Sequence, residues 1–111
     1  MGMTEIAVPS GQPVTLLEKR DEVGPEGLTL RLRFVAPEIG KGSDFDATME
    51  DMAHLCAAYG LDAADGEAGV PYRIIVSFSQ EPVEFGVADS SIIQFFEIFS
   101  IEEGKCQVEL F

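Results

Sequence analysis

The stretch that decides the fold is Leu28-Thr-Leu-Arg-Leu-Arg-Phe-Val35, because its apolar and polar residues alternate with a period of two. Four apolar side chains, ending with Phe34, fall on one face, and Arg31 and Arg33 fall on the other. One-sided alternation is typical of an antiparallel strand that buries one face and leaves the other open to water. We therefore predict a half-buried strand here.

A second strand is predicted just upstream, at Val14–Arg20. Between the two strands, Gly24-Pro-Glu-Gly27 has the composition of a turn. The two strands are expected to form a hairpin whose loop spans Asp21–Gly27. Residues 1–12 are expected to form an irregular N-terminal segment, and residues 13–111 a single domain.

Downstream of the hairpin, the sequence predicts one helix from about Phe45 to Tyr59. Apolar residues recur there at intervals of three and four, as on the buried face of an amphipathic helix. Gly60 follows where a left-handed residue commonly ends a helix. The predicted buried stripe consists of Phe45, Met49, Met52, Cys56 and Tyr59, widened by Leu55.

Three further strands are predicted at Tyr72–Ser79, Ile92–Ile101 and Cys106–Phe111, with a long connection over Gln80–Ser91. The segment Ile92–Ile101 fits the period of a strand or of a helix, and its aromatic and β-branched residues favour a strand. The element order is strand, strand, helix, strand, strand, strand. It predicts an α+β fold, with a mainly antiparallel sheet of four to five strands and one helix packed on a face.

The formal net charge of −13 restricts the partners. Residues 1–41 hold six acidic and five basic residues, whereas residues 42–111 hold fourteen acidic and two basic ones. Such a surface repels nucleic acids and anionic membranes, and no apolar run is long enough to span a bilayer. The excess acid serves solubility or attracts a basic partner or cations. With Met1 as the native start the expected location is cytoplasmic, and a periplasmic location after removal of a leader is the alternative.

The candidate reactive residues are two cysteines and one histidine. Cys56 and Cys106 are two buried free thiols, a disulfide or a reactive pair; these alternatives stay open. His54 lies within one helical turn of Asp51 and Glu50, so a surface ion pair with one of these carboxylates accounts for its presence. It is otherwise the one candidate base of a small hydrolase, although no nucleophile elbow accompanies it.

Acidic clusters raise the question of a metal site. Asp44-x-Asp46 stands in the predicted first helical turn, where the helix dipole accounts for it. Asp62-Ala-Ala-Asp-Gly-Glu67 lacks the spacing of an EF-hand loop. Glycine motifs of dinucleotide or phosphate loops are absent from the sequence. We expect no metal, no cofactor and no catalytic residues.

Two candidate binding features remain. Arg31 and Arg33 form either an anion-binding patch or cross-strand pairs with neighbouring acids. Phe95, Phe96 and Phe99 cannot all face one side of a strand. The phenylalanines are therefore either buried on both faces or partly exposed as an interface.

Seven strings spread along the chain resemble an uncharacterised family of short acidic alphaproteobacterial proteins, a domain of unknown function. The resemblance implies no catalytic residues, and it implies a leader ahead of Val8 in many relatives, hence export and a disulfide. The strings are Val8–Val14, Gly24–Leu30, Arg33–Pro37, Asp51–Cys56, Pro82–Gly86, Gln94–Glu97 and Gly104–Cys106.

Taken together, these features favour a non-enzymatic binding or interaction domain. Its partner is an unknown protein or a second copy of the chain, contacted through the C-terminal strands. The alternatives are a small hydrolase or ligand-binding enzyme centred on His54, and an exported domain closed by a Cys56–Cys106 disulfide.

Overall fold

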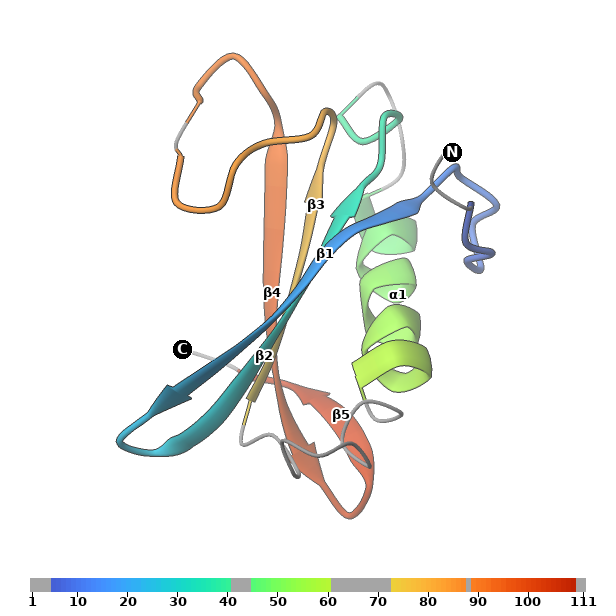
Figure 1. Ribbon diagram of the computed structural model, residues 1–111. Helices are drawn as coiled ribbons and strands as arrows, with labels where there is room; N and C mark the ends of the chain where they lie inside the picture. Colours follow the sequence, from blue (N-terminus) through green and yellow to red (C-terminus); the bar gives the residue numbers. More distant parts are fainter. Residues whose placement is uncertain (1–4, 41–44, 61–72, 88, 110–111) are drawn as a thin grey trace.

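The computed structural model describes residues 5–40, 45–60, 73–87 and 89–109, which form one twisted sheet with a helix across one face (Figure 1). A π-helical turn, η1, continues the helix directly. In chain order the elements are β1 (Thr15–Gly24), β2 (Gly27–Val35), α1 (Phe45–Leu55), η1 (Cys56–Gly60), β3 (Arg73–Ser79), β4 (Gln94–Glu102) and β5 (Lys105–Val108).

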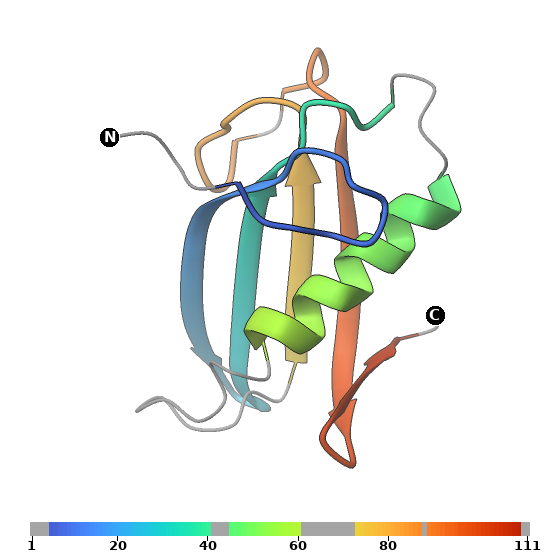
Figure 2. The ribbon, with the colours of Figure 1, turned by 90° about the vertical axis from the view of Figure 1, so that its right-hand side faces the viewer.

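The five described strands lie in chain order across the sheet, from β1 to β5. Neighbouring strands are antiparallel except for β2 and β3, which run parallel. The parallel pair arises because α1 lies between these strands in the sequence, so the chain crosses one face of the sheet before β3 begins. Figure 2 shows α1 running diagonally across that face. The predicted α+β fold, with a mainly antiparallel sheet and one helix on a face, is confirmed.

The first hairpin is tighter than the sequence predicts. β1 continues to Gly24 and β2 begins at Gly27, so only Pro25 and Glu26 connect them. The predicted loop over Asp21–Gly27 is wrong. Asp21 and Glu22 instead continue β1, where their backbones pair with β2 and their charged side chains lie at the surface of the sheet. A bulge at Leu17 shifts the register near the other end of β1.

The buried face of α1 keeps the centre of the predicted stripe, because Met52, Leu55 and Cys56 are fully buried. It differs at the ends of the stripe, since Phe45 is 58% exposed and Tyr59 is 38% exposed, and it also includes the polar residues Thr48 and Asp51. Counting apolar positions misses part of the face because two of the residues on it are polar. The π-helical turn also changes the angle between successive residues, and Tyr59 meets Phe34 edge to face at 6.3 Å while staying partly exposed.

Gly60 does not have the left-handed conformation that the sequence predicts. Its φ is not positive, and it lies inside η1 rather than beyond it. A Cβ at this position would lie 2.6 Å from the Cδ1 atom of Ile74 on β3. A side chain at position 60 would therefore have to displace the side chain of Ile74.

The core lies between α1 and the sheet, because alternate side chains of β2, β3 and β4 point toward the helix. Phe34 and Phe78 meet edge to face there, with 6.0 Å between their ring centroids. The buried core consists of Val8, Val14, Leu30, Leu32, Phe34, Ala36, Ile39, Met52, Leu55, Cys56, Ile74, Val76, Phe78 and Phe99.

The N-terminal segment has no regular strand or helix from Ile6 to Val14, and it is held against α1. The carboxylate of Asp51 accepts hydrogen bonds from the backbone N–H and hydroxyl of Ser10, at 2.9 and 2.5 Å, and from Nε2 of Gln12 at 2.6 Å. These contacts explain why an acidic residue lies on the buried face of the helix, since each of its oxygens has a donor.

The last two strands form a second tight hairpin. β4 spans Gln94–Glu102, so the strand favoured for the Ile92–Ile101 segment is confirmed with slightly shifted ends. The connection is Glu103-Gly104, and both residues have positive φ, as in a two-residue turn that matches the twist of the strands. β5 begins one residue before the predicted start at Cys106.

Candidate binding cleft

The face of the sheet turned away from α1 carries the second set of alternating side chains. Arg31 and Arg33 of β2 stand on it, beside Ile75 and Ser77 of β3. The connection from β3 to β4, described at residues 80–87 and 89–93, arches over this face (Figure 1). The loop and the sheet together enclose a hollow.

We call this hollow the binding cleft. Its volume is about 270 Å³, just below the usual range for small-molecule sites. Four strands and the loop contribute to it, so its walls are distant in sequence. The cleft is lined by Leu17, Arg31, Arg33, Ile75, Ser77, Ser79, Glu84, Phe85, Gly86, Val87, Gln94 and Phe96.

Phe85 is the loop residue that faces the cationic side chains. The central guanidinium carbon of Arg20 lies 4.0 Å from the centroid of its ring, and those of Arg31 and Arg33 lie at 5.4 and 5.5 Å. Cations within about 6 Å of an aromatic face are attracted by the ring quadrupole. The three contacts therefore hold the loop against the sheet.

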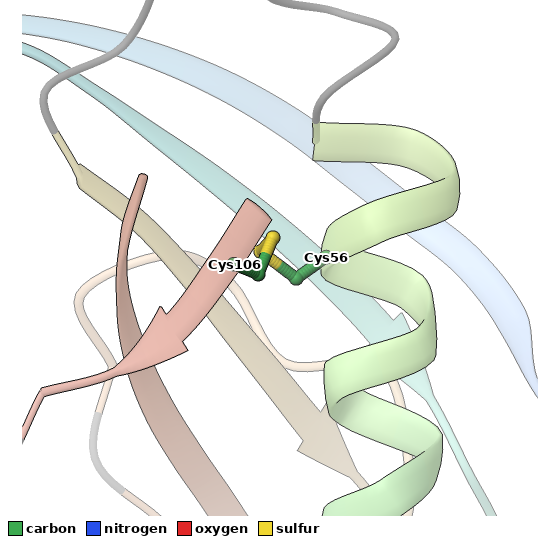
Figure 3. The surroundings of a disulfide bond; sticks show 2 residues. All are labelled: Cys56 and Cys106. Atoms are coloured by element: carbon green, nitrogen blue, oxygen red, sulfur yellow. A yellow bond between two sulfur atoms is a disulfide. The ribbon is translucent and has the colours of Figure 1, made fainter. Parts of the chain in front are cut away.

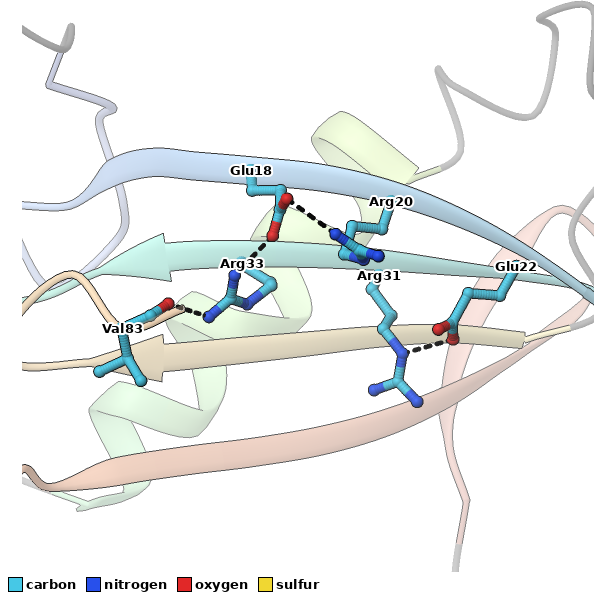
Figure 4. A network of polar contacts seen from close by, with 6 residues as sticks. All are labelled: Glu18, Arg20, Glu22, Arg31, Arg33 and Val83. Atoms are coloured by element: carbon cyan, nitrogen blue, oxygen red, sulfur yellow. Dashed lines mark hydrogen bonds and ion pairs between the residues drawn. The ribbon is translucent and has the colours of Figure 1, made fainter. Parts of the chain in front are cut away.

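Ion pairs fix these arginines in position (Figure 4). Glu18 accepts from Nη1 of Arg20 at 3.0 Å and from Nη1 of Arg33 at 2.5 Å. Nη2 of Arg33 donates to the backbone carbonyl of Val83, which joins the sheet to the loop. Nε of Arg31 donates to Glu22 at 2.6 Å. The predicted cross-strand pairing of the arginines with acids is thus present, and it borders the cleft.

The pKa of Glu18 reflects this environment. The hydrogen bond from Arg33 lowers the pKa of the carboxyl below its ordinary value, and Arg20 adds to the effect, while partial desolvation opposes it. Glu18 is therefore ionised at neutral pH.

A second, more open hollow borders the cleft and has a volume of about 620 Å³. The two hollows share Leu17, Arg33, Glu84 and Phe85 as walls.

The two cysteines form a disulfide between η1 and β5 (Figure 3). The Cα atoms of Cys56 and Cys106 are 6.3 Å apart, within the range that a disulfide spans without backbone movement. The bond lies on the helix side of the sheet. It attaches the short edge strand to the core and takes no part in the cleft.

The three candidate interface phenylalanines lie on different faces. Phe99 is fully buried, and Phe95 packs against the core and meets Phe45 edge to face at 5.6 Å. Phe96 points the other way and is 61% exposed at the border of the cleft. Only Phe96 offers substantial surface to a partner.

His54 is exposed on α1, on the opposite side of the sheet from the cleft, and lines neither hollow. The hydrolase alternative therefore finds no support in this geometry. Within the described ranges, no three His, Cys, Asp or Glu side chains are grouped to hold a metal. The acidic cluster at 62–67 and Asp44 lie outside the described residues. No helix of the described chain is long and apolar enough to cross a membrane.

Sequence reasoning identified Arg31 and Arg33 but missed Phe85, Ser77 and Leu17. The signal for Phe85 was available, because it is a large apolar residue in a polar connection, between Glu84 and Gly86. Nothing local distinguishes Ser77 or Leu17, whose place at the cleft follows from the strand register.

Comparisons with known proteins give one finding. A family model described as a family of unknown function (DUF6497) matches residues 1–111. Neither the search of curated proteins nor the search of solved structures gave a match.

Proposed function

The chain belongs to this family of unknown function, and from its geometry we propose that it is a non-enzymatic domain that binds a small ligand in the cleft. The observation that carries the proposal is the cleft itself, an apolar hollow with a few convergent polar groups. Such a hollow is the usual form of a small-molecule site.

The walls are suited to binding because they are held in place before a ligand arrives. Arg33 is tied to both Glu18 and the carbonyl of Val83, and its side chain is 14% exposed. Phe85 rests against three guanidinium groups. A preorganised site loses less conformational entropy on binding, so even a small cleft can give useful affinity.

A nuclear magnetic resonance titration tests the proposal. A set of small acids, alcohols and amines with alkyl or aryl bodies is added to the ¹⁵N-labelled chain. We expect the shifted amides to cluster on the cleft, at Ile75, Ser77, Phe85 and Phe96. A Ser77→Phe variant, which fills the cleft from its floor, should abolish these shifts. If no compound shifts these amides, the proposed function is wrong.

Self-association is a second candidate, favoured by the exposed Phe96 on β4. A large exposed aromatic ring next to other apolar surface is common at interfaces. Light scattering after size-exclusion chromatography tests it. We would expect a dimer that Phe96→Ser converts to a monomer, and a wild-type monomer at high concentration would contradict this candidate.

A further inference from the structure

We propose that the ligand of the binding cleft is a small carboxylic acid with an apolar body, and that Arg31 binds its carboxylate. The inference rests on the proposed function, because it names the class of ligand for the same cleft. It draws on the apolar surface, the charge balance and the hydrogen bonding of Arg31.

The apolar body of the ligand is inferred from the walls. Leu17 from the bulge of β1, Ile75 from β3, Phe96 from β4 and Val87 from the loop all line the cleft. Phe96 and Val87 are 61% and 49% exposed, so a ligand in the cleft can cover apolar surface that is open to water. Covering them with an alkyl or aryl group removes apolar surface from water and is favourable.

The negative charge of the ligand is inferred from the ion pairs. In the described part of the chain, the guanidinium groups of Arg20, Arg31 and Arg33 are paired with only two carboxylates, because Glu18 serves both Arg20 and Arg33. The ion pairs therefore leave one guanidinium charge without a carboxylate of its own, and Glu84, which also lines the cleft, balances it only at longer range. An anion placed here completes the pairing.

Of the two arginines that line the cleft, Arg31 is the one with donors to spare. Its Nε donates to Glu22, and among the described residues this is its one hydrogen-bonded acceptor. Its two terminal nitrogens point away from β1 and across β3 (Figure 4), on the side where Ile75 and Phe96 line the cleft. Two parallel N–H groups match the two oxygens of a carboxylate. Arg33 differs, since both of its terminal nitrogens already have acceptors.

Glu84 is a cleft residue whose charge should weaken the binding of an acid. It is exposed on the loop and lines the cleft, so its charge opposes that of a bound carboxylate. Removing the charge of Glu84 should strengthen the binding of an acid, whereas removing that of Arg31 should weaken it.

The test compares three probes with the same eight-carbon chain: octanoate, octanol and octylamine. Each is titrated into the ¹⁵N-labelled chain, and dissociation constants are obtained from the shifts of the cleft amides. We expect octanoate to bind at least about tenfold more tightly than octanol, the ratio typical of one charge-assisted pair. Octylamine should bind more weakly than octanol.

Variants then assign the effect to Arg31. Arg31→Gln should abolish the preference for octanoate over octanol, and Glu84→Gln should increase it. Arg31→Lys, which keeps the charge but loses the paired donors, should restore part of it. Lys19→Gln is the matched control, because Lys19 is an exposed cation of the same hairpin on the helix side of the sheet. The amide spectrum of each variant reports its fold.

The outcomes separate the two proposals. If octanol shifts the cleft amides as strongly as octanoate, the cleft binds ligands but the inference about the acid is wrong. If Arg31→Gln and Lys19→Gln weaken octanoate equally, the effect is one of overall charge and Arg31 does not bind the carboxylate. If none of the three probes shifts these amides, the inference about the acid is wrong, and the proposed function fails with it when the wider set of compounds leaves the same amides unshifted.

Discussion

The disulfide gives the prediction whose size follows most directly from the structure. Cys56 and Cys106 are separated by 50 positions in the sequence. Closing a loop of about 50 residues in the unfolded chain removes entropy worth about 4 kcal/mol at 25 °C in the chain-entropy model. We therefore expect the Cys56→Ala/Cys106→Ala variant to lose about 4 kcal/mol of unfolding free energy, with an additional cost for the buried sulfur of Cys56.

The assay is urea unfolding followed by far-ultraviolet circular dichroism, because the chain has no tryptophan for fluorescence. The unfolding entropy expected for 111 residues converts 4 kcal/mol into a fall in melting temperature of about 17 °C. Wild-type protein in a reducing buffer is the control, since it lacks the cross-link but keeps both sulfur atoms. It should lose the same cross-link entropy, worth about 4 kcal/mol, without the additional cost of the missing sulfur.

Two results would refute this reasoning. A loss below about 1 kcal/mol in both samples would mean that the cross-link does not restrict the unfolded chain as the loop length implies. A loss in the variant alone would attribute the effect to packing of the sulfurs. Amide exchange in reduced protein distinguishes a third case, in which β5 detaches locally while the rest of the sheet stays intact.

Three further predictions concern the helix side of the sheet. Gly60→Ala should cost about 1–3 kcal/mol of unfolding free energy by overpacking against Ile74, and Ile74→Val should recover part of this loss. Urea unfolding in a double-mutant cycle measures the coupling, and additive effects would contradict the steric explanation. Asp51→Ala should cost about 3 kcal/mol of unfolding free energy, because it leaves the donors of Ser10 and Gln12 without their acceptor. Ser10→Ala should cost about 1 kcal/mol, and equal losses in urea unfolding would contradict the role of Asp51 as the shared acceptor. Burial raises the pKa of Glu97, so its ionised form opposes folding; Glu97→Gln should stabilise the protein at neutral pH, and the gain should shrink as the pH falls through that raised pKa.

The strands were predictable because their signals are local. β2 alternates apolar and polar residues along its length, and this pattern alone gives the buried face and the cationic face. The presence of a helix after the hairpin also followed from spacing. Its buried face followed only in part: Met52 and Leu55 were expected on it, but Asp51 is buried through partners 39 and 41 positions away in the sequence.

The cleft was only half predictable for the same reason. Arg31 and Arg33 were singled out by their place on the open face of β2. The loop between β3 and β4 completes the site, because its residues Phe85 and Val83 contact the arginines. These contacts form only after β3 has paired with β2. Single-sequence patterns contain no information about that contact.

The parallel pairing of β2 with β3 has a consequence for the rate of folding. The β1–β2 and β4–β5 hairpins close over two-residue turns, so the chain can form them early and independently of each other. β2 and β3 can pair only after the whole connection that contains α1 has been brought across the sheet, at a considerable cost in loop entropy. We expect this docking of two preformed hairpin halves to limit the rate, with the cleft assembled last because its walls come from both halves.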